Sequence, residues 1–268
     1  MQIETLLDHE IKIGPRLSWE HEQYLKRMTL QVCLIGQYGF VLASDTRGVR
    51  LGPDEITQHF TASKIYFNER ECVAWCSSGY VLGKRLCQMI DELFTTEEAQ
   101  NGQRTLPELT RLVRDIASSV NTSVYERQMK IGDGKFMLVA QRGAQVEGII
   151  FELGWMTNPE AWGTKGGHPF KDKMVSGATG NAAIFFPERF YRKAQTELEH
   201  LRIASHTVLT GHQLDPGPID GLEIVVCCAG KLRELHEDEL ESLRNFSLNL
   251  DTLVADQFVD SPDVIRNR

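Results

Sequence analysis

Three side chains with complementary chemistry are spaced so that one β-hairpin and a following strand could bring them together. Thr29 precedes the apolar run Leu30 to Ile35, and Asp45 follows a second apolar run that starts after the glycine-bounded turn 36–39. Because a tight turn returns the second strand alongside the first, we expect Thr29 to lie near Asp45. A third strand led by Lys64 would place an ammonium beside both. A hydroxyl, a carboxylate and a lysine at one point indicate nucleophilic chemistry.

A threonine hydroxyl is a weak nucleophile until a base takes its proton. The α-amine would serve as this base if Thr29 were the first residue of the mature chain, because its pKa of about 7.7–8.0 lies near neutral pH. Lys64 would favour the neutral amine and stabilise a developing oxyanion, while Asp45 would hold Lys64 and balance its charge. Singly, each residue has an ordinary structural explanation, as a β-branched strand residue or a structural ion pair. Together they predict a catalytic site.

The order and spacing of these residues resemble the proteasome β-subunit family, which includes bacterial proteasome-like peptidases of the N-terminal-nucleophile (Ntn) hydrolase class. The resemblance rests on Thr-x15-Asp-Thr-Arg beginning at Thr29, on Ser-Lys-Ile at 63–65, and on a Ser-Gly turn at 78–79 before a helix. It is clear over about residues 29–94 and weaker to about residue 230. It implies that Thr29 is the nucleophile, Asp45 the orienting aspartate and Lys64 the lysine of the family.

Three further residues take roles by resemblance alone. The backbone N–H of Gly79 would bind the oxyanion. Thr179, in the stretch SGATG, aligns with a serine that the family places near the terminal amine, so a hydroxyl remains there. Asp215 aligns with the aspartate of a later Asp-x-x-Ser motif whose serine position is Pro218 here, which weakens the network around the terminal amine.

The resemblance implies a threonine-type endopeptidase of a self-compartmentalising, proteasome-like assembly that cleaves peptides or unfolded polypeptides. It implies a homo-oligomer, a ring or a related assembly, and leaves room for an ATPase partner. Two other functions stay open. One is a non-catalytic structural subunit, which the helix-like stretch LSWEHEQYLKR before the first strand favours. The other is an Ntn amidase acting on a small amide.

The first 28 residues bear on this mechanism because they precede the proposed nucleophile. We interpret residues 1–28 as an N-terminal extension or propeptide, or as sequence upstream of the true start. Self-cleavage at Met28 would lack the glycine that commonly precedes such a threonine and lets the backbone bend. Translation from Met28 followed by removal of that methionine is the route that we favour.

Composition excludes several classes of function. The net charge of −8 argues against a nucleic-acid partner. No apolar run reaches the roughly 18 residues that span a bilayer, so no membrane partner is expected. Six cysteines without a CxxC pair indicate a reduced, cytoplasmic chain. No metal-binding pattern such as HExxH occurs, and no cofactor is expected.

Apolar periodicity predicts an α+β protein, a four-layer αββα sandwich of the Ntn-hydrolase type, and the resemblance implies the same fold. The domain would span residues 29–255, and 256–268 would form a C-terminal tail. Residues 48–62 read as a loop, and Thr105 with Glu108 as a capping box before the second helix. The expected strands are 30–35, 40–43, 63–68, 71–76, 136–141, 146–153, 174–178 and 222–229, and the expected helices are 80–94, 107–129, 182–200 with a break at Pro187, 203–213 and 234–243.

Overall fold

Two five-stranded antiparallel sheets form the centre of the computed structural model, together with a separate two-stranded sheet. The structure describes residues 29–51, 57–78, 82–96, 103–126, 134–153, 167–178, 180–217 and 219–259. Within these ranges, no helix is long and apolar enough to cross a lipid bilayer.

The first sheet contains the hairpin that the sequence predicts. Its order is β10-β1-β2-β11-β12. The hairpin closes tightly, because the N–H of Gly36 donates to the carbonyl of Gly39 at 2.8 Å. Gly39 has a φ of +149°, and a Cβ there would lie 1.9 Å from the carbonyl oxygen of Cys227, so only glycine fits. The strands are β1 (Leu30–Ile35), β2 (Gly39–Ser44), β10 (Lys173–Gly177), β11 (Glu223–Cys228) and β12 (Lys231–Glu234).

The second sheet has the order β5-β6-β7-β8-β9. The strands expected at 63–68, 71–76, 136–141 and 146–153 are confirmed with shifted ends. The short strand at 168–170 was not among the expected strands, and β6 continues through Ser78, where a turn was expected. The strands are β5 (Ile65–Asn68), β6 (Val73–Ser78), β7 (Gly134–Arg142), β8 (Gln145–Leu153) and β9 (His168–Phe170).

The prediction of a loop over residues 48–62 was wrong. Strand β3 (Arg47–Leu51) pairs with β4 (Thr57–Thr61) in an antiparallel register that sets Arg47 opposite Thr61. The Gly-Pro pair that suggested a loop falls between the two strands, outside the described residues. The flanking residues are partly β-branched or aromatic, and such residues favour strands.

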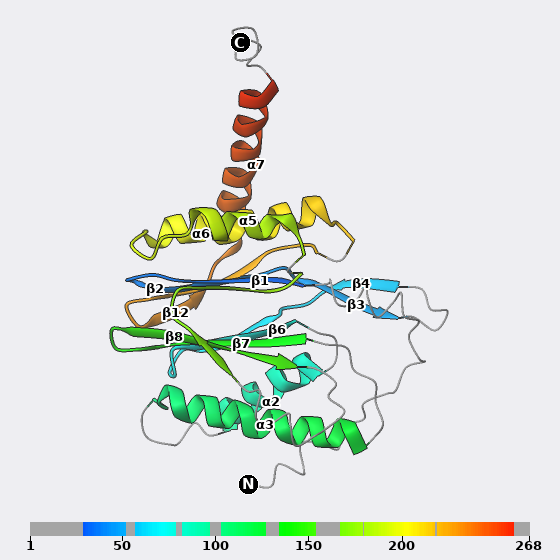
Figure 1. The fold of residues 1–268 in the computed structure, drawn as a ribbon, viewed down its shortest axis with the longest axis vertical. Coiled ribbons are helices and arrows are strands. Elements are labelled where there is room, and N and C mark those ends of the chain that lie inside the picture. The colour runs from blue at the N-terminus through cyan, green and yellow to red at the C-terminus, as the bar shows by residue number, and fades with distance from the viewer. Residues whose placement is uncertain are drawn as a thin grey trace.

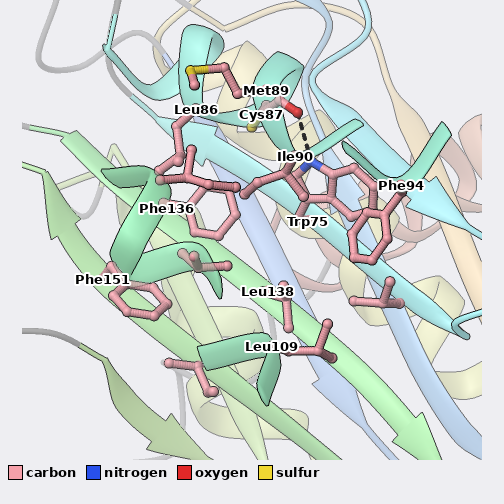
Figure 2. Packing of buried hydrophobic residues seen from close by; sticks show 14 of the residues in the cluster. Trp75, Leu86, Cys87, Met89, Ile90, Phe94, Leu109, Phe136, Leu138 and Phe151 are labelled. Atoms are coloured by element: carbon pink, nitrogen blue, oxygen red, sulfur yellow. Dashed lines mark hydrogen bonds between the residues drawn. The ribbon is translucent and has the colours of Figure 1, made fainter. Parts of the chain in front are cut away.

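Helices α2 (Leu82–Thr96) and α3 (Leu106–Glu126) pack on the outer face of the second sheet, as expected (Figure 1). The predicted capping box at the start of α3 is confirmed, because Thr105 and Glu108 exchange side-chain and backbone hydrogen bonds. Figure 2 shows the apolar cluster between these layers, where the indole N–H of Trp75 donates to the carbonyl of Cys87 at 3.2 Å. The only polar atom of this buried indole is therefore satisfied.

The remaining helices lie on the other side, against the first sheet, and their boundaries differ from the prediction. The break expected at Pro187 comes after Phe190 instead, because a proline in the first turn of a helix costs no hydrogen bond. Thr196 and Glu199 then form a capping box that starts the next helix, earlier than the expected residue 203. The elements are the 3₁₀ turn η2 (Ala182–Ile184), α5 (Phe185–Phe190), α6 (Glu197–Leu214) and α7 (Glu237–Val259).

Helix α7 differs most from its expected bounds of 234–243. Its first half packs against α6 and places Leu240 and Leu243 in the apolar cluster between α6 and the first sheet. Its second half extends away from the sheets (Figure 1) and continues to Val259, so residues 256–259 are helical, while the domain bounds stay a prediction. Residues 260–268 of the expected tail lie outside the described residues.

Alternation along the strands explains why both faces of each sheet are buried. In β1, Val32 and Leu34 contact the helices, while Cys33 and Ile35 face the second sheet. The same alternation in β6 and β7 places Ala74 and Met137 in the cluster between the sheets. The result is a mixed α/β structure whose antiparallel sheets pack together, with helices over their outer faces (Figure 1).

Candidate active site

Thr29 lies immediately before β1, and its main chain is held against the end of β10. The N–H of Ala178 donates to the carbonyl of Thr29 at 2.6 Å. Gly177 has a φ of +89°, and a Cβ on it would lie 1.8 Å from the same carbonyl oxygen. Such a Cβ would also lie 3.4 Å from that of Ser78, so the end of β6 closes on this point. Thr29 is thus placed by a close backbone approach that requires glycine at 177.

Asp45 follows β2 and is fully buried. One carboxylate oxygen accepts the N–H of Leu30 at 2.9 Å, and the other accepts the N–H of Arg47 at 3.2 Å. The main chain of Asp45 also donates to the carbonyl of Leu30 at 3.3 Å. The aspartate is therefore fixed on the residue that follows Thr29, as the hairpin predicts.

Lys64 joins the other two residues. Its Nζ donates to Asp45 Oδ2 at 2.6 Å and to Thr29 Oγ1 at 3.1 Å. The lysine side chain is 13% exposed and the aspartate side chain 0% exposed, so water screens this ion pair weakly. The structure thus brings together the hydroxyl, the lysine and the carboxylate that the sequence singles out.

Burial acts on the ionisation of both partners. It raises the pKa of the Asp45 carboxyl, against the lowering effects of Lys64 and of the two backbone donors. It lowers the pKa of Lys64, against the raising effects of Asp45 and Glu223. Each shift favours the uncharged form, so Lys64 can release and accept a proton nearer to neutral pH than an exposed lysine.

Glu223 is a buried residue of the site that sequence reasoning missed. It opens β11 with 6% of its surface exposed, and its Oε1 accepts the N–H groups of Lys64 and Ile65. Burial raises the pKa of Glu223 to about 7, although Ser63, Lys64 and Ile65 stabilise the ionised form. The only signal in the sequence was a carboxylate inside the otherwise apolar stretch LEIVVCCA.

Arg47 attaches the site to the loop after α6. Its guanidinium forms an ion pair with Asp220 and donates to the carbonyl of Gly217 at 3.2 Å. Asp215 lies in the same loop as the C-cap of α6, where its N–H donates to the carbonyl of Gly211 at 3.0 Å. Among the described residues, no hydrogen bond or ion pair connects the Asp215 side chain to Thr29.

Two predicted site residues, Gly79 and Thr179, lie outside the described residues. The described residues that precede them in the chain, Ser78 and Ala178, both approach the Thr29–Gly177 contact. The roles of Gly79, Thr179 and Asp215 stay predictions. Within the described ranges, no group of three or more His, Cys, Asp or Glu side chains could hold a metal ion.

Comparison with known proteins finds similarity in fold but not in sequence. No family model matches the chain. No curated protein matches it either. Three similar solved structures are Anbu from Hyphomicrobium sp. strain MC1, its (Gly-1) mutant, and Anbu (ancestral beta-subunit) from Yersinia bercovieri. Their TM-scores are 0.61, 0.62 and 0.62, with 13%, 13% and 11% identity. The aligned regions span 85%, 86% and 84% of this chain and 96% of each Anbu chain. The likeness shows that this chain shares the overall fold of the Anbu structures.

Proposed function

We propose that this protein is a threonine-type peptidase of a proteasome-like assembly, with Thr29 as the nucleophile and a four-layer αββα sandwich as its fold. The observation that carries the proposal is the position of Lys64 Nζ, 3.1 Å from Thr29 Oγ1 and 2.6 Å from the buried Asp45 carboxylate. An ammonium confined between a hydroxyl and a carboxylate is the arrangement that lowers the cost of forming an alkoxide.

The proposed reaction is acyl transfer to the Thr29 hydroxyl. Thr29 Oγ1 attacks the carbonyl carbon of a peptide bond, and its proton passes to a base. The C–N bond then breaks as the proton is delivered to the leaving amine, and water hydrolyses the resulting ester. The N–H of Gly79 is the proposed oxyanion donor, and the hydroxyl of Thr179 would lie near the amine of Thr29.

Two groups could act as the base, and the structure bears on one of them. Lys64 lies within hydrogen-bond distance of the hydroxyl, and burial lowers its pKa toward neutrality. The α-amine of Thr29 becomes a base only when the chain begins there. We therefore propose that the mature chain starts at Thr29, by translation from Met28 and removal of that methionine.

The proposed assembly is a homo-oligomer that encloses its active sites and admits peptides or unfolded polypeptides. An ATPase partner could deliver these substrates. The likeness in fold to Anbu supports an oligomer. The six cysteines are all described and all free, which supports a reducing compartment such as the cytoplasm. Light scattering should therefore report a particle much larger than the 30.4 kDa chain.

The decisive experiment compares Thr29→Val with Thr29→Ser on fluorogenic peptides. Valine keeps the shape of the side chain and removes the hydroxyl, so kcat should fall at least about 10³-fold, while serine should retain measurable turnover. N-terminal sequencing of protein made from its own gene should give Thr29 first. An electrophilic peptide inhibitor should add one equivalent of mass to the wild type and none to Thr29→Val.

Full turnover by Thr29→Val would contradict the assignment of the nucleophile. An inactive mature protein that keeps residues 1–28 would favour the non-catalytic subunit. A monomer that hydrolyses small amides but not peptides would favour the amidase.

A further inference from the structure

One carboxylate ties the two sheets together next to the candidate site. Glu223 begins β11 in the first sheet, while the two N–H groups that its Oε1 accepts belong to Lys64 and Ile65, at the start of β5 in the second sheet. The contact joins residues 159 and 158 positions apart in the chain. It is therefore a tertiary link and not part of either sheet's own hydrogen bonding.

The position of β5 in its sheet explains why Lys64 needs this link. β5 is an edge strand, and its ladder with β6 starts at the pair Ile65–Cys76, one residue after Lys64. The residue that carries the reactive ammonium is therefore outside the ladder. A backbone N–H at a partly buried edge needs an acceptor, and Glu223 accepts the N–H of Lys64.

The residue at the other end of this link, Glu223, also lies next to the site. β11 pairs with β2 in a register that sets Glu223 opposite Ser44, the residue before Asp45. The same carboxylate thus connects the backbone of Lys64 to β11, the neighbour of the strand β2 that Asp45 follows. Any drift of Lys64 away from β11 would change its 3.1 Å contact with Thr29 and its 2.6 Å contact with Asp45.

We propose that Glu223 is a positioning residue that acts through Lys64, holding its backbone so that Nζ reaches both Thr29 Oγ1 and Asp45. This inference rests on the proposed function, because it assigns Glu223 a part in the same reaction. Misplacing a catalytic group by about 1 Å can cost about 10²-fold in rate. Glutamine at 223 would keep an Oε1 acceptor for both N–H groups, whereas alanine would remove it.

Glu71 provides a matched control. It is equally buried, at 6% exposure, and it too accepts a backbone N–H, that of Arg104 at 2.9 Å. It precedes β6, while the site lies at the other end of that strand, beyond Ser78. Glu71 also forms ion pairs with Arg104 and Arg142, so Glu71→Ala should disturb the fold at least as much as Glu223→Ala, without reaching Lys64.

The test measures three quantities in full-length Glu223→Ala, Glu223→Gln and Glu71→Ala: peptidase kinetics, hydrogen exchange of the Lys64 and Ile65 amides, and the rate at which acetic anhydride labels Lys64. Glu223→Ala should lower kcat about tenfold to 10²-fold with KM little changed, and should speed exchange and labelling at least tenfold. Glu223→Gln should restore most of each quantity. Glu71→Ala should match the wild type in all three.

The exchange and labelling measurements do not depend on turnover, so they remain informative if the wild type hydrolyses no peptide. In that case the proposed function fails, and faster labelling of Lys64 in Glu223→Ala alone would still support the positioning role. Unchanged exchange and labelling would overturn the role. Faster exchange with unchanged kcat in an active enzyme would overturn it as well. If Glu223→Ala does not fold, Glu223→Asp replaces it, because the shorter side chain withdraws the acceptor while keeping the charge.

Discussion

Asp45→Asn is the sharpest test of the electrostatics of the candidate site. The substitution preserves the size of the side chain and one acceptor oxygen, which can still take the N–H of Leu30. It replaces the other oxygen by an amide N–H₂ group that faces two donors, the N–H of Arg47 and the ammonium of Lys64. Lys64 would then be a nearly buried cation that has lost the carboxylate of Asp45.

The expected cost follows from burial. Asp45 is fully buried and the lysine side chain is 13% exposed, so little water replaces the lost charge. Removing one partner of a buried pair costs about 3–5 kcal/mol of the free energy of unfolding. Lys64 can relieve the cost by losing its proton. Loss of Asp45 lowers the pKa of Lys64 in the folded variant further below its ordinary value of 10.5. Between these two pKa values the unfolded chain, whose lysine is still protonated, binds more protons than the folded chain. Stability of the variant therefore rises with pH.

Urea unfolding followed by circular dichroism, at one fixed protomer concentration, measures the effect. Asp45→Asn should lose about 3–5 kcal/mol at about pH 6 and less at about pH 9. Adding Lys64→Met removes the buried cation that has lost Asp45 and should recover about half of the loss or more. Asp220→Asn is the control, because its carboxylate is 45% exposed and its pair with Arg47 should be worth less than about 1 kcal/mol. A loss below about 1 kcal/mol for Asp45→Asn, or no recovery in the double variant, would refute this reasoning.

Two further predictions test the surroundings of the site. Gly177→Ala should lower the free energy of unfolding by about 3 kcal/mol or more, because its Cβ would meet the carbonyl of Thr29. Gly143→Ala is the control: with φ +59° and no atom within 4 Å, it should lose only the roughly 1–2 kcal/mol of a left-handed alanine. Equal losses in urea unfolding would count against the close approach at Gly177. The pKa of Glu223 is about 7 in the folded chain and 4.5 ordinarily, so its stabilising effect is complete below about pH 4.5 and is lost as pH rises through 7. The free energy of unfolding should therefore fall by about 3 kcal/mol over this range in the wild type and not in Glu223→Gln. Parallel pH dependences of stability in the two proteins would contradict this.

The parts of the site that the sequence could predict are those made by neighbours along the chain. A two-strand hairpin with a glycine at its turn brings its ends together, so the proximity of Thr29 and Asp45 followed from spacing alone. The capping box of Thr105 and Glu108 was readable for the same reason, since its partners are three residues apart. Lys64 could be predicted because the sequence indicates a further strand at its position, although β5 begins one residue later, at Ile65.

The parts that escaped prediction depend on strand order. Glu223 reaches Lys64 only because β11 pairs with β2 in one particular register, and no local pattern encodes that pairing. A continuous apolar run is typical of a buried strand whatever its neighbours are, so a carboxylate at its start could equally have faced solvent. The pair of strands β3 and β4 was not predicted for a different reason. In a short two-stranded sheet the alternation of apolar and polar residues is weak.

The sequence suggested that the stretch 176–180 contributes the hydroxyl of Thr179 to the site, and Thr179 lies outside the described residues. The described residues Gly177 and Ala178 contribute main-chain contacts to Thr29. The positive φ of Gly177 and the absence of its Cβ allow the carbonyl of Thr29 to approach and to accept the N–H of Ala178. This contact fixes the main chain of the proposed nucleophile on one side, while Asp45 fixes the next residue through the N–H of Leu30. Thr29 is therefore held through the main chain from two directions, and within the described part of the chain the hydrogen-bond partner of its hydroxyl is Lys64. Such an arrangement suits a nucleophile, because the reacting atom is positioned without being used as a structural hydrogen-bond partner of the main chain.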